Sequence, residues 1–404
     1  MNARKIAGGV LAPKGFLAAA VACGIKDTKG KLDLAILASD RPTTAAGMFT
    51  RNRVCGAPVK VNRKRIGRGR LRAVVVNAGC ANVCTGKAGV ADAEAMTAAV
   101  AKTLGLKTAD VAVCSTGIIG RRMPMANALA GIAAAAPKLA AGDRASAAFS
   151  KAIMTTDTVP KTAAVEFRVG GKAVRVAGTI KGAGMIAPNV ATMLCFLTTD
   201  AAVAIPLLRS ALREAVGLTL NRLTIDGDQS TSDTVLLFAN GASGAPAITG
   251  GSARAAFRGA LFTVLDSLAE QLVLDGEGAS KYVEIEVTGA ATPRDAERAA
   301  KAIAESVLLK CAMYGSDPNW GRIACAAGYS GARFREESLS IDIGGHGVMR
   351  RGMATGASPD ALHRAVCGKR ITIGVDLGAG RHAARFRTCD LTHKYVDINA
   401  LYHT

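Results

Sequence analysis

The chain has 404 residues, of which 50% are hydrophobic and 20% are charged. A single hydrophobic core stops growing at roughly 250–300 residues, so this length predicts two domains or several packed layers. The 45 glycines and 12 prolines follow no fixed period, which excludes collagen-like and low-complexity proteins. We therefore expect a folded protein of the α/β class.

Lysine and arginine outnumber aspartate and glutamate by 51 to 31, which gives a net charge of +20. This surplus attracts anionic small molecules, phosphates or acidic surfaces. Aromatic residues make up only 4% of the chain and do not alternate with basic clusters, so we expect no nucleic acid partner. The ten cysteines are too sparse for a disulfide scaffold and lack zinc-ligand spacing, which favours a reducing cytoplasm and no metal.

An apolar stretch at residues 15–23 follows two basic residues, as in a secretory signal peptide. Pro13 and Lys14 interrupt the pattern, and no cleavage site follows the stretch. The most apolar later segment, 125–136, is shorter than the roughly 20 residues needed to cross a bilayer. We therefore expect no membrane span and no membrane partner.

Runs of β-branched residues alternate with alanine-rich stretches along the chain, which predicts strands alternating with helices. The expected strands are 71–77, 111–114 with a turn at 115–117, a hairpin over 164–180 that turns at Gly170 and Gly171, a strand starting near Thr192, and 282–289. The expected helices are 91–104, one ending at 136, 144–154, 206–217 and 253–274. The strand at 282–289 is expected to open a βαβ-type C-terminal domain.

The sequence contains none of the common catalytic motifs. All five histidines lie between residues 346 and 403, and none forms an H-E-x-x-H or similar metal-ligand cluster. There is no G-x-S-x-G elbow, no G-x-x-x-x-G-K-[ST] phosphate loop and no kinase motif set. Gly182 and Gly184 lack the third glycine of a dinucleotide-binding loop.

Because these motifs are absent, a threonine hydroxyl is the catalytic nucleophile that we consider next. This hydroxyl needs a base, and a chain break that frees the residue's own α-amino group supplies one, with an unperturbed pKa of about 7.7–8.0. Thr192 follows the glycine-rich segment 181–191, in which Pro188 fixes a turn and Ala191 puts a small side chain at the scissile bond. From spacing alone, an ordinary glycine-rich loop that enters a strand is the favoured interpretation.

Residues 181–200, KGAGMIAPNVATMLCFLTTD, resemble the self-cleavage signature of the ornithine acetyltransferase (glutamate N-acetyltransferase) family of arginine biosynthesis. Further segments resemble the same family in the same order, so the resemblance covers essentially the whole sequence. They are GGVLAPKGFLAAAVACGIK (8–26), AVCSTGIIG (112–120), MTTDTVPK (154–161), TIDGDQSTSDTV (224–235), LDGEGASK (274–281), SDPNWGRI (316–323) and TCDLTHKYVDINALYHT (388–404).

This resemblance implies a self-processing acyltransferase. The chain would cleave between Ala191 and Thr192. Thr192 would then attack the acetyl carbonyl of N2-acetylornithine, release ornithine and hold the acetyl group as an ester until glutamate accepts it. The fragments 1–191 and 192–404 would associate as an α2β2 heterotetramer. No metal or organic cofactor is implied, and acetyl-CoA stays open as a second acetyl donor.

The resemblance also assigns site residues. Thr116 and Gly117 match the family's oxyanion-stabilising pair. Lys181 suits a substrate carboxylate and Glu277 suits an ammonium group, by charge type. The implied substrate contacts are Thr158, with Thr155 and Thr156 beside it in the same motif, Lys181, Thr192, Glu277, Asn399 and Thr404. The last two require the C-terminus to return to the site.

The resemblance implies an α/β fold in which a layered αββα domain spans residues 1–280 and a smaller C-terminal α/β domain spans 281–404. Two other functions stay open. A related self-processing amidase or aminopeptidase would resolve the acyl-threonine with water. A basic binding protein would use only the net charge of +20.

Overall fold

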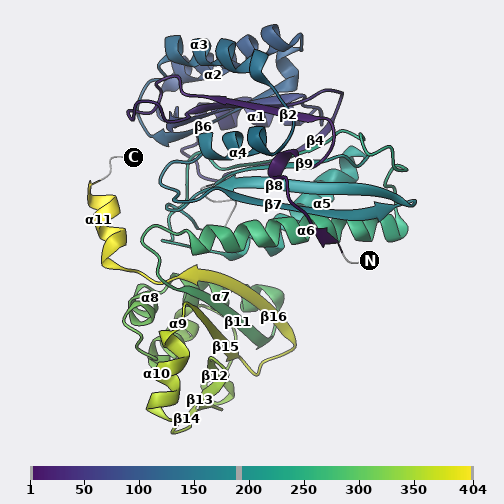
Figure 1. Ribbon diagram of the computed structural model, residues 1–404. Helices are drawn as coiled ribbons and strands as arrows, with labels where there is room; N and C mark the ends of the chain where they lie inside the picture. Colours follow the sequence, from purple (N-terminus) through teal and green to yellow (C-terminus); the bar gives the residue numbers. More distant parts are fainter. Residues whose placement is uncertain (1–2, 188–192, 402–404) are drawn as a thin grey trace.

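The computed structural model of the protein describes residues 3–187 and 193–401, whose strands form three sheets (Figure 1). Two of the sheets lie face to face with helices on their outer sides, and the third belongs to a smaller C-terminal unit. This arrangement confirms the predicted α/β class and the αββα layers. No helix within the described ranges is long and apolar enough to cross a bilayer.

The first sheet has four strands in the order β2-β3-β5-β6, and its last two strands are parallel. Its apolar runs are buried on both faces, as expected for strands covered by helices on one side and a second sheet on the other. The strands are β2 (Phe16–Val21), β3 (Leu34–Ser39), β5 (Ala73–Cys80) and β6 (Val111–Ile118).

The predicted turn at residues 115–117 is wrong, because β6 continues through these residues to Ile118. Parallel pairing with β5 extends the strand, and Thr116 lies opposite Ala78 while Gly117 lies opposite Gly79. These small residues carry no apolar pattern of their own, so only the neighbouring strand shows that they are extended.

The second sheet has six strands in the order β1-β7-β8-β9-β10-β4. Pairing is antiparallel except between β9 and β10. The hairpin of β7 and β8 turns at Gly170 and Gly171, both with positive φ, as predicted. The strand expected near Thr192 begins, within the described residues, at Leu194. The strands are β1 (Arg4–Lys5), β4 (Thr44–Phe49), β7 (Lys161–Val169), β8 (Lys172–Lys181), β9 (Leu194–Thr199) and β10 (Thr234–Ala239).

Three apolar cores hold these layers together. Helices α2 (Gly86–Leu104) and α3 (Met125–Ala135) cover the outer face of the first sheet, with α1 (Ala57–Ile66) beside α2. Helices α5 (Ile205–Leu218) and α6 (Gly251–Leu274) cover the outer face of the second. The core between the sheets also takes Phe149 of α4 (Asp143–Ala152), which meets Phe196 edge to face at 5.4 Å between ring centroids.

The C-terminal unit is a six-stranded sheet in the order β14-β13-β12-β15-β11-β16 with its own apolar core. The predicted βαβ character is found only in part: β11 pairs in parallel with β15, but the connection between them includes β12, β13 and β14 as well as helices. The division at residues 280 and 281 stays a prediction. The elements are β11 (Tyr282–Ala290), α7 (Pro293–Glu305), α8 (Val307–Tyr314), α9 (Trp320–Tyr329), β12 (Ser340–Ile343), β13 (His346–Arg350), β14 (Met353–Ala354), α10 (Pro359–Cys367), β15 (Arg370–Asp376) and β16 (His382–Cys389).

The last helix, α11 (His393–Leu401), leaves the third sheet and extends back to the larger unit (Figure 1). The Thr392 hydroxyl donates to the Gly278 carbonyl oxygen at 2.7 Å, and the Tyr395 hydroxyl donates to Asp226 at 3.3 Å. These contacts hold the C-terminal segment next to the ends of β6 and β8.

Candidate active site

A cavity lies where β6 and β8 end and α11 crosses the larger unit. Its lining comes from the ends of both strands, the segment before β10, the segment after α6, and α11. The lining residues are Ala81, Thr116, Gly117, Ile119, Thr155, Thr156, Lys181, Gly184, Met185, Ser230, Thr231, Ser232, Glu277 and Asn399. The structure thus brings together five of the predicted site residues, namely Thr116, Gly117, Lys181, Glu277 and Asn399. Ala191, Thr192 and Thr404 lie outside the described residues.

Gly117 lies at a close approach between β5 and β6. Its φ is 124°, and a Cβ at this position would lie 2.5 Å from the carbonyl carbon of Gly79 and 2.7 Å from the nitrogen of Cys80. No side chain fits against that backbone, so glycine is required here for steric as well as conformational reasons. The neighbouring Thr116 side chain and the Gly117 backbone therefore border the cavity without a bulky group between them.

Lys181 ends β8 as a buried cation at the cavity wall. Its ammonium group lies 3.4 Å from the Thr116 hydroxyl. Burial lowers the pKa of Lys181; Asp157 opposes this change, Lys161 adds to it, and Glu277 opposes it. A cation that burial disfavours gains stability from an anion entering the cavity, so Lys181 is suited to bind a carboxylate.

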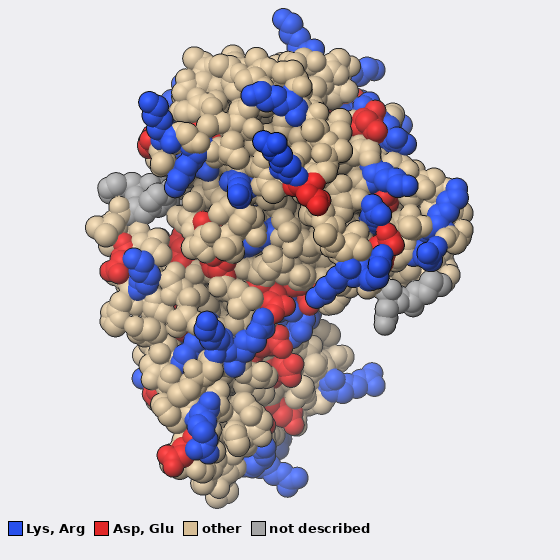
Figure 2. Space-filling view, viewed as in Figure 1, with Lys and Arg blue, Asp and Glu red and all other residues tan. Residues whose placement is uncertain are grey.

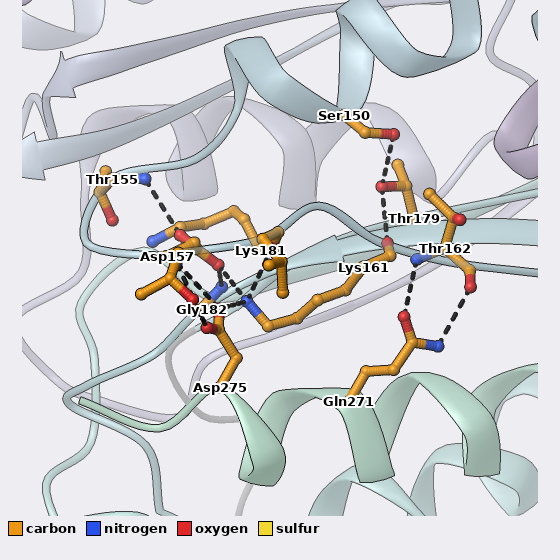
Figure 3. A network of polar contacts seen from close by, with 12 residues as sticks. Ser150, Thr155, Asp157, Lys161, Thr162, Thr179, Lys181, Gly182, Gln271 and Asp275 are labelled. Carbon is orange, nitrogen blue, oxygen red and sulfur yellow. Dashed lines mark hydrogen bonds and ion pairs between the residues drawn. The ribbon is translucent and has the colours of Figure 1, made fainter. Parts of the chain in front are cut away.

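A buried ion cluster lies directly behind Lys181 (Figure 3). The Lys161 ammonium lies 2.7 Å from Asp157 and 2.5 Å from Asp275, and the Lys161 side chain is fully buried. Asp157 also accepts hydrogen bonds from the amides of Thr155 at 3.0 Å and Gly182 at 2.6 Å. The cluster therefore joins the 155–158 segment to the first residue after β8.

Asp157 stays ionised despite its burial. Burial raises the pKa of this carboxyl, but the charges of Lys181 and Lys161, with hydrogen bonds from Lys161 and the Gly182 amide, outweigh it and lower the pKa to about 2. Sequence reasoning missed Asp157, Lys161 and Asp275 as site-supporting residues. The available signal was their presence in the two segments MTTDTVPK and LDGEGASK.

Thr158 does not line the cavity. Its hydroxyl and its amide both donate to Asp275, and it is among the lining residues of a neighbouring cavity. Thr155 and Thr156 line the cavity instead. The structure thus separates the three threonines that share this motif.

Hydrogen bonds hold the described residues on both sides of positions 188–192. Asp226 accepts hydrogen bonds from the amides of Met185 at 2.5 Å and Ile186 at 2.8 Å. On the other side, the Met193 amide donates to Asp233 at 2.9 Å. The Met193 carbonyl oxygen accepts from the Thr234 amide at 3.0 Å. The DGDQSTSD segment therefore positions the chain both before and after the predicted nucleophile.

Glu277 closes the cavity together with α11. Its backbone amide donates to the Ala183 carbonyl oxygen at 2.8 Å, and its carboxylate accepts from the Asn399 amide group at 2.8 Å. A Cβ at Gly184 would lie 2.3 Å from the Glu277 carboxylate, so glycine leaves room for this side chain. Asn399 thus reaches the site from the far end of the chain.

A model of the ArgJ family matches residues 17–404. The chain belongs to the ArgJ family. The arginine biosynthesis bifunctional protein ArgJ of Symbiobacterium thermophilum is 47% identical over 401 residues, which cover 99% of each chain. A crystal structure of the bifunctional ArgJ of Bacillus halodurans is 40% identical with a TM-score of 0.50, and the match covers 51% of this chain and 98% of that chain. The ornithine acetyltransferase of Mycobacterium tuberculosis, solved with ornithine, is 44% identical over 46% of this chain and 99% of that one, with a TM-score of 0.44.

Membership of the ArgJ family identifies the protein as an acyltransferase of arginine biosynthesis. It decides against the amidase or aminopeptidase alternative, and it leaves the basic binding protein without support. The family expectation drawn from the sequence motifs is therefore confirmed.

Proposed function

We propose that the protein moves an acetyl group from N2-acetylornithine to glutamate through an acetyl ester on Thr192, giving ornithine and N-acetylglutamate. The observation that carries this proposal is the cavity that gathers Thr116, Gly117, Lys181 and Glu277 at the segment leading to Thr192. The name of the Mycobacterium tuberculosis relative, ornithine acetyltransferase, supports the same donor.

The reaction proceeds in two half-reactions on one nucleophile. The α-amino group of Thr192, freed by cleavage after Ala191, takes the hydroxyl proton as the oxygen attacks the acetyl carbonyl. The tetrahedral oxyanion is stabilised by donors at Thr116 and Gly117, and removal of one such donor costs about 2.7–4 kcal/mol in enzymes of this type. Collapse expels the ornithine amine, which takes the proton. The amine of glutamate then attacks the ester and regenerates Thr192.

The two charged residues of the cavity bind different groups of the substrate. Lys181 binds the α-carboxylate that N2-acetylornithine and glutamate share, because an anion beside its buried ammonium offsets the free-energy cost of burying that charge. Glu277 binds an ammonium group, either that of the ornithine side chain or that of Thr192. Asn399 holds the Glu277 carboxylate in place through its 2.8 Å hydrogen bond.

Self-cleavage accompanies this function in the proposal. The Bacillus halodurans chain is matched over 98% of its length by only 51% of this chain, whereas the Symbiobacterium thermophilum relative matches over 99% of each. Chains of both lengths in one family support a precursor that is cut near its middle. We further propose an α2β2 heterotetramer, a cytoplasmic location, and acetyl-CoA as a second acetyl donor, in line with relatives named bifunctional.

An intact mass spectrum before and after brief exposure to N2-acetylornithine tests the proposal. The expected result is two fragments that meet at Ala191 and Thr192, with one acetyl group on the C-terminal fragment that disappears when glutamate is added. A single uncleaved chain that takes up no acetyl group would overturn the proposal.

The variant Thr192→Ala is expected to lose both cleavage and turnover, because it has no hydroxyl. The matched variant Thr192→Ser keeps a hydroxyl at the same position and is expected to retain both at reduced rates. Full turnover in Thr192→Ala would rule out Thr192 as the nucleophile.

A further inference from the structure

A second cavity adjoins the active site on the other side of the 155–158 segment. Its lining comes from the loop between β2 and β3, the end of α4, and the segment itself. The lining residues are Lys26, Lys31, Leu32, Lys151, Met154, Thr155, Asp157, Thr158 and Pro160. Three of them are lysines, and Thr155 also lines the active-site cavity. The two cavities therefore share a wall.

The charge of this second cavity is strongly positive. Its lining has three ammonium groups and one carboxylate, that of Asp157, which is already paired with Lys161. None of Lys26, Lys31 and Lys151 forms an ion pair with an acidic side chain among the described residues. The cavity thus has a surplus of unpaired cations, unlike the ion cluster on the other face of Asp157.

Lys26 is held in place at both ends. The Asp33 carboxylate accepts hydrogen bonds from the backbone amides of residues 23–26 at 2.7–3.1 Å, so the backbone of this loop is fixed. The Lys26 ammonium donates to the Leu32 carbonyl oxygen at 2.9 Å, which leaves two of its three protons for a ligand. A fixed, half-buried ammonium loses little conformational entropy when an anion binds.

The lysines also repel one another. Burial lowers the pKa of the Lys26 ammonium, Asp33 opposes this change, and the charges of Lys31 and Lys181 lower the pKa further. A bound anion would relieve this repulsion. The charge of Asp157, which lines this cavity, raises the pKa of Lys26 and so opposes the effect of Lys181.

We propose that this cavity, lined by Lys26, Lys31 and Lys151, binds the phosphate groups of a phosphorylated ligand. Lysine ammonium groups bind phosphate as point charges, and three of them match a diphosphate better than a single carboxylate. The diphosphate comes either from the acetyl-CoA donor, in which case the inference rests on the function proposed above, or from free inorganic diphosphate. In a CoA thioester the pantetheine arm separates the diphosphate from the reacting carbonyl, so its phosphates belong in a cavity beside the active site.

The first test is calorimetric titration of the full-length protein with inorganic diphosphate and with CoA. The double variant Lys31→Gln/Lys151→Gln is expected to weaken binding of both probes by about tenfold or more, because two charge-assisted contacts are lost. Both side chains are exposed, so the fold should persist, which thermal unfolding checks. Lys29→Gln is the matched control, since Lys29 is an exposed lysine of the same loop that does not line the cavity.

Three results would overturn the proposal. The first is that the unaltered protein binds neither probe. The second is that Lys29→Gln weakens binding as much as the double variant does. The third is that succinate displaces diphosphate at matched concentration, which would indicate a carboxylate site.

The second test separates the two sources of the phosphate groups. With acetyl-CoA as donor, the double variant is expected to raise KM by about tenfold or more, while kcat/KM for the phosphate-free donor S-acetyl-N-acetylcysteamine stays unchanged. Diphosphate binding that the double variant weakens, without any turnover of acetyl-CoA, would assign the site to free diphosphate. That outcome would show that acetyl-CoA is not an acetyl donor, while the cavity would still be a phosphate-binding site.

Discussion

Lys161 is a fully buried charge beside the active site. Its side chain is fully buried between two carboxylates, and neither carboxylate is exposed to more than a few per cent. A buried cation between two anions is costly to desolvate, so its main role is to fix geometry. It holds the 155–158 segment, the start of the glycine-rich segment, and the residue after α6 in one arrangement.

The variant Lys161→Met is expected to destabilise the protein by about 3–5 kcal/mol, because it leaves Asp157 and Asp275 buried without their cation. Urea unfolding followed by circular dichroism measures the loss. Lys138→Met, at an exposed lysine, should change the unfolding free energy by less than about 0.5 kcal/mol. A loss of under 1 kcal/mol in Lys161→Met would show that the carboxylates find other partners.

The lowered pKa of Lys181 predicts pH-dependent binding of carboxylate ligands. Burial favours the neutral amine in the free protein, whereas a bound carboxylate favours the ammonium and raises the pKa in the complex. Binding therefore takes up a proton, and affinity for glutamate should fall as pH rises through the lowered pKa.

Titration calorimetry in buffers of different ionisation enthalpy measures this uptake, which should approach one proton per site at alkaline pH. In Lys181→Met the uptake should disappear. Proton uptake that persists in this variant would place the titrating group elsewhere.

At the scale of elements, the pairing of β5 with β6 determines the shape of the cavity wall. Gly117→Ala should destabilise the protein by about 2 kcal/mol or more, because the new methyl group would meet the backbone of Gly79 and Cys80. Gly120→Ala is the matched control, since Gly120 also has positive φ but has no atom within 4 Å of a Cβ. Thermal unfolding of both variants separates the steric cost at Gly117 from the conformational cost of positive φ, which both positions share. Equal losses of stability in the two variants would show that the steric contact does not contribute.

The sequence predicts the interiors of most elements and little of their ends. Helix α6 was expected over 253–274 and runs over Gly251–Leu274, because its apolar periodicity is long. Strands β5 and β6 were expected to end at 77 and 114, and both run farther. Their last residues are small and lack a pattern, so cross-strand pairing alone makes them extended.

The candidate site was also predicted only in part. Thr116, Gly117, Lys181, Glu277 and Asn399 were predicted from the family resemblance, and spacing alone would not have joined them. The cluster behind them was missed because Lys161 and Asp275 lie 114 residues apart in the chain. Pairing across such a separation depends on the packing of α6 against the hairpin of β7 and β8, which no local pattern encodes.

At the scale of the whole molecule, the net charge of +20 has no single location on the face shown in Figure 2. Lys and Arg side chains are spread over this face, with Asp and Glu side chains between them. A continuous basic stripe of the kind that tracks a nucleic acid backbone is not seen there. A local surplus of lysines is found instead in the cavity lined by Lys26, Lys31 and Lys151, where Asp157 is the one carboxylate among the lining residues.

Cleavage at Ala191 should leave the two fragments together. Both contribute strands to the second sheet, and each contributes residues to the core between the sheets. Size-exclusion chromatography of the cleaved protein should give one peak that contains both fragments, and separation should need denaturant. Two peaks without denaturant would contradict a shared core.

The position of β9 also bears on whether the proposed cleavage after Ala191 precedes or follows folding. β9 lies inside the second sheet between β8, which precedes the predicted cut, and β10, which follows it. If the two halves were synthesised as separate polypeptides, the first would expose the edges of β8 and β4 and the second those of β9 and β10, and such edges promote aggregation. Continuous synthesis lets β8 and β9 pair as an intramolecular step before the peptide bond breaks. The proposed scission would therefore follow folding, and we expect two separately expressed halves to give less correctly folded protein than the continuous chain.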